Sequence, residues 1–165
     1  HCPGSNLKLG SGLAPIAEMR DRGISVSLGA DGAACNNRLD IFDEMRLAAT
    51  LQAVRKAPGA LPAREVVWMA TREGARALGL EAEIGSIEVG KRADLVLLER
   101  DRPHLSPDVD PWSAIVYSAR GTDVRTVVVD GEVLVHDFAL IRADEREVAA
   151  AARVAGGEVV RRARL

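Results

Sequence analysis

Asp31 stands in a short turn, Gly29-Ala30-Asp31-Gly32, that directly follows a predicted strand over residues 24–28. Catalytic groups of α/β barrels lie at the carboxyl ends of the strands, and glycine lets the backbone approach a ligand closely. A carboxylate oxygen in such a place can bind a divalent cation and take a proton from water. Aspartate also caps turns without any catalytic role, so the local pattern leaves two interpretations open.

The histidines and cysteines do not form a recognisable metal-binding motif. His1 could be a ligand, a proton carrier or a hydrogen-bond partner of a substrate, whereas His104 and His136 are expected at the surface. The chain contains no His-x-His and no Glu-x-x-His. Cys2 and Cys35 could share a zinc ion only if their loops were neighbours, and no Cys-x-x-Cys accompanies them. These residues alone do not complete a site of three or four ligands.

The composition is that of a globular protein with an aliphatic core. Hydrophobic residues make up 47 % of the 165 residues but aromatic residues only 3 %, so alanine, valine, leucine and isoleucine must fill the interior. A net charge of −2 argues against a nucleic-acid surface, and no apolar run approaches the roughly 20 residues of a membrane span. Two cysteines are too few for a disulfide framework, which makes a reduced, cytoplasmic setting the default expectation.

Helices and one strand must position Asp31, and a β-rich unit follows them. The chemistry of caps, turns and periodic apolar residues places the boundaries. The predicted elements are a loop over 1–10, a helix over 13–20 ending before Gly23, a strand over 24–28, a helix capped by Asp40 over 40–54, a helix with Pro62 in its first turn, a helix over 73–78, a strand ending at 98, a short helix over 111–118, a hairpin of 124–129 and 132–135, and a helix from 144 that ends near Gly156.

Four stretches, in order, resemble motifs of the deaminase and chlorohydrolase branch of the amidohydrolase superfamily. Residues 1–9, His-Cys-Pro-Gly-Ser-Asn-Leu-Lys-Leu, resemble its seventh barrel strand, and residues 28–37 with the helix after them resemble its eighth. Residues 84–96 are similar to the start of its small β-sandwich domain, and residues 127–132 to the hairpin that closes that domain. Within the branch, the similarity is greatest to methylthioadenosine/S-adenosylhomocysteine deaminases.

The resemblance implies an α/β fold in three parts. Residues 1–84 would be the last strands and helices of a (β/α)8 TIM-barrel metal-dependent hydrolase, residues 85–140 a segment of the β-sandwich, and residues 141–165 a C-terminal helix. It also implies one divalent metal, zinc first and iron second, that activates water for attack on a ring carbon bearing an amino or chloro group.

By the same resemblance, Asp31 is both the metal ligand and the proton shuttle of the eighth strand. The residues expected to bind substrate or support the pocket are His1, Ser5, Asn6, Asn36 and Asn37. The other ligands and the acid/base residues of the family are expected upstream of His1. Asp31 alone would hold a cation weakly and would place it poorly for acidifying water.

The resemblance therefore implies hydrolysis of a non-peptide C–N bond, namely deamination of an adenosine-type nucleoside or thioether. Two alternatives stay open: a chlorohydrolase or deaminase of triazines and other N-heterocycles, and an inert fragment that serves only as a structural piece. The expected partners are a small N-heterocyclic substrate and further copies of the intact protein in a homo-oligomer, but neither nucleic acid nor membrane. Bound metal and turnover distinguish the enzymes from the inert piece.

Overall fold

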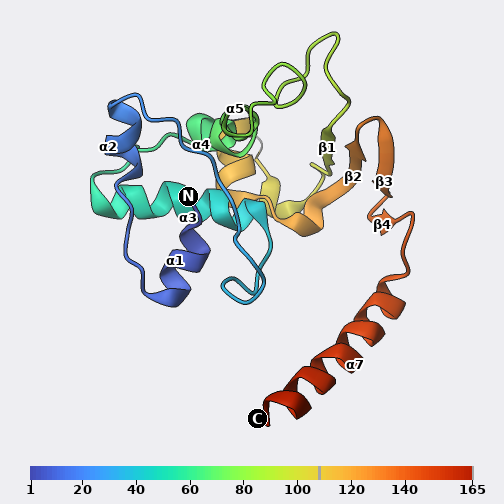
Figure 1. Cartoon of the computed structure of the whole chain (residues 1–165). Coiled ribbons are helices and arrows are strands. Elements are labelled where there is room, and N and C mark those ends of the chain that lie inside the picture. Colours follow the sequence, from blue (N-terminus) through green and yellow to red (C-terminus); the bar gives the residue numbers. More distant parts are fainter. Residues whose placement is uncertain (108, 165) are drawn as a thin grey trace.

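The computed structural model describes residues 1–107 and 109–164 as a helical body, a four-stranded sheet and a C-terminal helix that projects from them (Figure 1). The mixture of helices and sheet agrees with the predicted α/β class. The elements are α1 Pro3–Leu9, α2 Ile16–Asp21, α3 Ile41–Arg55, α4 Ala63–Ala70, α5 Arg72–Ala77, β1 Leu95–Leu98, the 3₁₀ turn η1 Pro103–Leu105, α6 Pro111–Ser113, the π-helical turn η2 Ala114–Ser118, the 3₁₀ turn η3 Gly121–Asp123, β2 Val124–Val129, β3 Glu132–His136, β4 Ala139–Leu140 and α7 Glu145–Ala163.

The core of the body lies where α3, α4 and η2 meet. Val66 and Met69 of α4 are three residues apart, so they share one face, and both are fully buried. They pack with Met45, Ala48 and Val116 from the neighbouring elements. The core is therefore aliphatic, as the composition predicts.

Local signals mark the helix ends correctly at several places. The Asp40 side chain caps α3 by accepting a hydrogen bond from the Phe42 amide at 2.9 Å. Gly23 and Gly79, with φ of 76° and 70°, end α2 and α5 in the left-handed conformation that glycine favours. Pro62 lies one position earlier than predicted, at the N-cap of α4.

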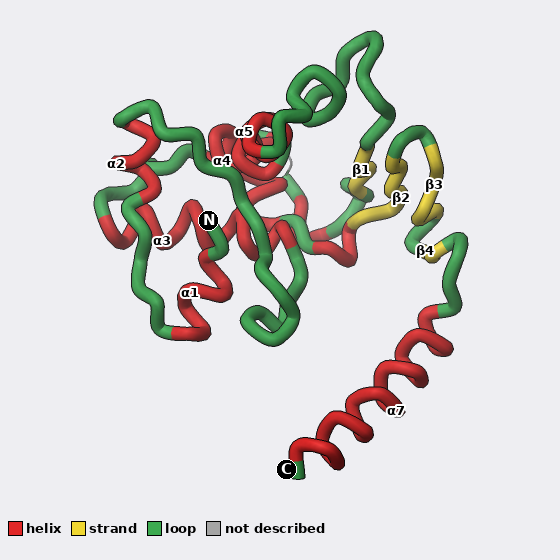
Figure 2. The backbone as a smooth tube through the Cα atoms, in the orientation of Figure 1, coloured by secondary structure: helices red, strands yellow, loops and turns green. Residues whose placement is uncertain are grey.

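The sheet is antiparallel throughout and has the order β1-β2-β3-β4 (Figure 2). Asp130 and Gly131, with φ of 51° and 80°, form the two-residue turn between β2 and β3. The predicted hairpin is confirmed.

The prediction of a loop over residues 1–10 is wrong, because α1 occupies most of it. Pro3 stands in the first turn, where a helix needs no amide donor, and Gly10 closes the helix at φ 70°. Gly4 and Ser5 are poor helix formers, but their polar groups bind partners far along the chain, which outweighs the local preference.

The predicted strand over residues 24–28 is not formed, since these residues run extended without a ladder. His1 lies beside them: the His1 amine donates to the Ser27 carbonyl at 2.8 Å, and the Gly29 amide donates to the His1 carbonyl at 3.0 Å. On the other side, the Leu28 amide donates to the Met69 carbonyl at 3.2 Å, which is a single bond to the end of α4 and not a strand ladder. In a parallel β pair, one residue bonds the residues before and after its neighbour on the other strand, and His1 bonds Ser27 and Gly29 in this way, on either side of Leu28.

The C-terminal helix continues past its predicted end. α7 runs through Gly156 and Gly157 to Ala163, although each glycine costs about 1 kcal/mol relative to alanine in a helix. Neither glycine takes a left-handed φ, so neither ends the helix. Residue 165, the last of the predicted segment 141–165, lies outside the described residues.

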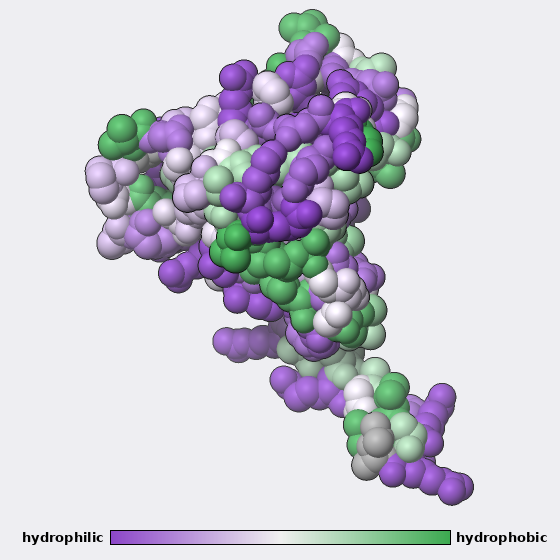
Figure 3. All heavy atoms as spheres, turned by 90° about the vertical axis from the view of Figure 1, so that its left-hand side faces the viewer, coloured by the Kyte–Doolittle hydropathy of each residue, from purple (hydrophilic) through white to green (hydrophobic). Residues whose placement is uncertain are grey.

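Polar and apolar atoms alternate over the face in Figure 3, with an apolar cluster near its middle. Along α7 at the bottom of this view the two kinds are likewise mixed. None of the helices in the described ranges combines the length and the apolar character that crossing a membrane requires.

Candidate functional site

Asp31 lies in the loop between the extended segment and α3, and both of its carboxylate oxygens are held. Oδ2 accepts a hydrogen bond from the Ser5 hydroxyl at 2.7 Å, and Oδ1 accepts one from the Gly32 amide at 2.7 Å. Ser5 is buried in α1, whereas Asp31 is exposed. The fold thus brings together two predicted site residues that are 26 positions apart, and it fixes the carboxylate while leaving it accessible.

These contacts lower the pKa of the Asp31 carboxyl below its ordinary value. The largest cause is the hydrogen bond from Ser5, followed by those from the Gly32 amide and the Cys35 side chain. Hydrogen bonds donated to a carboxylate favour its charged form. Asp31 is therefore ionised at neutral pH, with lone pairs left for a cation or a proton.

Asn36 braces the Asp31 loop from inside the protein. Its amide nitrogen donates to the Ala30 carbonyl at 2.9 Å and to Glu44 Oε1 at 2.7 Å, while its oxygen accepts from the Arg38 amide at 3.1 Å. The side chain is 7 % exposed. Substrate contact by Asn36 stays a prediction, and loop support is what its bonds provide.

Sequence reasoning missed the part that Glu44 plays in the site. Glu44 is 1 % exposed, and its Oε2 accepts from the Gly4 amide at 2.9 Å. From the sequence alone, Glu44 is one of the acidic residues that suit the positive N-terminal end of the helix that Asp40 caps. A stronger signal was available: Glu44 falls at helical spacing on the stripe of Met45, Ala48 and Gln52, all buried, and carboxylates are rarely buried without partners.

The remaining predicted residues surround the same loop. His1 is half-buried, and its Nε2 is enclosed without a hydrogen-bond partner among the described residues. Asn6 is half-buried on α1, next to Ser5. Asn37 accepts a hydrogen bond from Lys8 Nζ at 2.7 Å, and Lys8 also binds the Ala34 carbonyl. The substrate contacts expected of these residues stay predictions.

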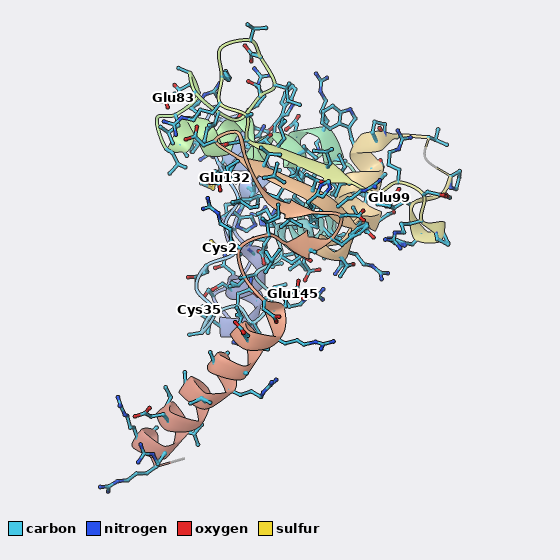
Figure 4. The ribbon with its side chains drawn as sticks, turned by 90° about the vertical axis from the view of Figure 1, so that its right-hand side faces the viewer. Cys2, Cys35, Glu83, Glu99, Glu132 and Glu145 are labelled. Carbon is cyan, nitrogen blue, oxygen red and sulfur yellow. The ribbon has the colours of Figure 1, made fainter. Side chains whose placement is uncertain are left out.

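Both cysteines are free (Figure 4). Cys2 Sγ lies against Gly29, where an added Cβ would be 3.3 Å away, and Cys35 lies within the loop, where its side chain helps to lower the pKa of Asp31. Within residues 1–107 and 109–164, no group of three His, Cys, Asp or Glu side chains is placed to hold a metal ion. Asp31 suits zinc as a single oxygen ligand, so further ligands must complete any site.

A separate cavity of about 560 Å³ opens at the N-terminal end of α3. Arg38, Arg46, Arg120 and His104 are among the residues that line it, and Asp31 is not. His104 lies at the surface, as expected, with Nε2 2.9 Å from Asp123 Oδ2.

Curated proteins of known activity match nearly the whole chain. The 5'-deoxyadenosine deaminase of Methanosarcina acetivorans is 49 % identical over 164 residues, which are 99 % of this chain and 38 % of that protein. A 5-methylthioadenosine/S-adenosylhomocysteine deaminase of Halobacterium salinarum is also 49 % identical, with the same coverage. The chain thus spans less than two fifths of the length of these relatives.

Solved structures of zinc-containing enzymes superpose closely. An adenosine deaminase from Xanthomonas campestris with bound zinc has a TM-score of 0.90 at 40 % identity, covering 93 % of this chain and 35 % of that one. An atrazine chlorohydrolase from Arthrobacter aurescens complexed with zinc has a TM-score of 0.85 at 33 % identity, covering 93 % and 34 %. These matches confirm the resemblance found in the sequence. Since the model of the amidohydrolase family also matches residues 1–134, the chain belongs to the amidohydrolase family.

Proposed function

We propose that the protein containing this chain hydrolytically deaminates an adenosine-type nucleoside, and that Asp31 is its metal ligand and proton shuttle. The observation that carries the proposal is an accessible, ionised carboxylate whose two oxygens are held by Ser5 and Gly32. The deaminases among the relatives support the choice of substrate class.

The residues 1–84 would form the end of a (β/α)8 barrel, with His1 and Leu28 on its last two strands. The bonds from His1 to Ser27 and Gly29 support this arrangement, because they have the parallel pattern and the helices α1 and α2 connect the two segments. Asp31 then follows the carboxyl end of a barrel strand, where catalytic residues of such barrels lie.

The sheet β1–β4 would be one part of a β-sandwich. Val96 of β1 is 58 % exposed, and a second layer of strands on its face of the sheet would cover this apolar side chain.

A divalent metal, with zinc favoured by the two zinc-containing neighbours, fits the oxygen chemistry of Asp31. When bound, such an ion lowers the pKa of water and so supplies a nucleophile at neutral pH. The chain itself contributes the held carboxylate. Asp31 accepts a proton as water adds to the ring carbon and returns it as ammonia leaves, while Ser5 and Gly32 keep the carboxylate oriented.

The test is a chimera that joins this chain to the part of the Methanosarcina acetivorans deaminase that it does not match. We expect the folded chimera to bind about one equivalent of zinc and to release ammonia from 5'-deoxyadenosine. Asp31→Asn should lower kcat by about 100-fold or more, since it removes the proton acceptor. Asp43→Asn, which changes an acid on the first turn of α3, is the matched control. A folded, zinc-loaded chimera whose rate is unaffected by Asp31→Asn would refute the proposal.

Hydrolysis of a chlorinated N-heterocycle is the second candidate, because an atrazine chlorohydrolase is among the close structural neighbours. Chloride release from atrazine, measured on the same chimera, distinguishes it from deamination. A chimera that folds but has neither zinc nor turnover would instead favour the inert structural piece.

A further inference from the structure

Glu44 is a buried carboxylate on α3, and no cationic side chain of the described residues pairs with it. Its two oxygens bind the Gly4 amide and the Asn36 side chain, and within the described residues it forms no ion pair with lysine, arginine or histidine. Burying a charge is costly, and apolar side chains of similar size are often better for stability. A reason for this carboxylate beyond stability must therefore be sought in what its partners do.

The first hydrogen-bond partner of Glu44, the Gly4 amide, connects it to Asp31 through α1. Glu44 Oε2 accepts from the Gly4 amide at 2.9 Å. The next residue, Ser5, donates its hydroxyl to Asp31 Oδ2 at 2.7 Å. Glu44 thus fixes the turn of α1 from which Ser5 donates its hydrogen bond to the Asp31 carboxylate.

The second hydrogen-bond partner of Glu44, the Asn36 side chain, connects it to Asp31 through the loop that contains Asp31. Glu44 Oε1 accepts from Asn36 Nδ2 at 2.7 Å, and the same nitrogen donates to the Ala30 carbonyl at 2.9 Å. Ala30 immediately precedes Asp31. The Asn36 amide therefore connects Glu44 to the peptide bond between Ala30 and Asp31.

Asp31 needs such support because its backbone is in an unfavourable conformation. Its φ of 62° lies in the left-handed region, which residues with a Cβ rarely adopt. A conformation of this kind persists only where the surroundings hold it, and such positions concentrate at active sites.

We infer that Glu44 is a positioning residue: its buried carboxylate joins the Ser5 and Ala30 sides of the site and so sets the orientation of Asp31. The inference rests on the proposed role of Asp31. It requires that loss of the Glu44 bonds disturb Asp31 more than it disturbs the fold.

The experiment begins with Glu44→Gln, which keeps size and one acceptor but turns the other oxygen into a donor. In the full chain, the Gly32 amide reports on Asp31, because it donates to Oδ1. We expect its proton resonance to shift and its hydrogen exchange to accelerate. In the deaminase chimera we expect zinc affinity and kcat to fall 10- to 100-fold, as with other residues that orient metal ligands, while KM changes less than about twofold. Asp43→Asn should change none of these.

A second variant, Glu44→Gln combined with Asn36→Asp, separates positioning from packing. The new amide can donate to the new carboxylate and still accept from Gly4, so the contact between the two side chains returns. The bond to Ala30 does not return, because a carboxylate cannot donate. We expect the melting temperature to recover but the Gly32 resonance and kcat not to recover.

Recovery of the melting temperature, the Gly32 resonance and kcat together in the double variant would overturn the inference. A Glu44→Gln variant that loses stability while the Gly32 resonance and kcat stay unchanged would overturn it as well. Failure of the proposed function looks different. If Asp31→Asn leaves deamination intact, the catalytic role of Asp31 is refuted, and the Gly32 resonance in the full chain still decides whether Glu44 orients it.

Discussion

Replacing Gly4 with alanine should destabilise the chain, although helix propensity predicts the opposite. Gly4 is the second residue of α1, and alanine is favoured over glycine inside a helix by about 1 kcal/mol. A Cβ at this position, however, would lie 2.3 Å from Glu44 Oε1 and 2.9 Å from Asn36 Nδ2. Tertiary contact and local preference therefore act in opposite directions.

The size of the effect follows from these distances. Ordinary van der Waals contact begins near 3.4 Å, so Oε1 must retreat by about 1 Å. Its 2.7 Å bond to Asn36 then exceeds hydrogen-bond range, and loss of a bond to a charged group costs about 1.5–3 kcal/mol. After subtraction of the helix gain, the free energy of unfolding should fall by about 0.5–2 kcal/mol. For a chain of this length that is a decrease in melting temperature of about 1–8 °C.

The assay is urea denaturation of the wild-type chain and the Gly4→Ala variant under identical conditions. Gly156→Ala and Gly157→Ala in α7 are the matched controls, because an added Cβ meets no atom within 4 Å at either position. Both controls should increase helix content. A Gly4→Ala chain that is as stable as the wild type, or more stable, would refute the reasoning about the Glu44 contacts.

Three further results are expected. Met69→Ala should lower the free energy of unfolding by about 2–5 kcal/mol, because the side chain is fully buried in the core. Ser5→Ala should raise the pKa of Asp31, measured by a carbon-13 titration, because it removes the main hydrogen bond to the carboxylate. The lowered pKa of Asp31 stabilises the fold fully above the ordinary pKa of aspartate, and this stabilisation is lost as the pH falls through the lowered pKa. The variant should therefore lose less stability in acid than the wild type. Asp40→Ala should cost about 2 kcal/mol, because it removes both the α3 cap and the 3.2 Å bond to the Gly121 amide.

Each of these results has its own check. Met69→Leu, which nearly conserves volume, should cost less than about 1.5 kcal/mol, and equal losses from both substitutions would show that packing is not responsible. An unchanged Asp31 titration in Ser5→Ala would contradict the main cause given for the lowered pKa. Asp40→Ser keeps a capping oxygen but not the reach to Gly121, so a loss as large as that of Asp40→Ala would mean that the cap contributes nothing.

Features set by neighbouring residues could be predicted from the sequence. The cap at Asp40, the glycine ends of α2 and α5 and the turn at Asp130 depend on one residue and the backbone next to it. The position of Asp31 in a glycine-flanked turn could be read in the same way, and the resemblance supplied its expected role.

Features set by distant partners could not be predicted. α1 forms where Gly4 and Ser5 find acceptors 40 and 26 residues away, and no local pattern encodes such bonds. The prediction of a strand over residues 24–28 was wrong because a distant partner is missing: alternating side chains form a strand only when another strand can pair with them. The helical spacing of Glu44 on a buried stripe indicates that its carboxylate needs partners, but that these partners are the Gly4 amide and the Asn36 side chain became visible only in the folded chain.

The separation of α7 from the body determines what spectroscopy of this chain can measure. All described residues of α7 are exposed, so this helix lacks the tertiary packing that supplies most of the stability of helices in proteins. Circular dichroism therefore adds the gradual melting of α7 to the cooperative unfolding of the body. Both tryptophans, Trp68 in α4 and Trp112 in α6, belong to the body. Indole fluorescence consequently follows the part of the molecule that holds Asp31, and it is insensitive to fraying at the C-terminus.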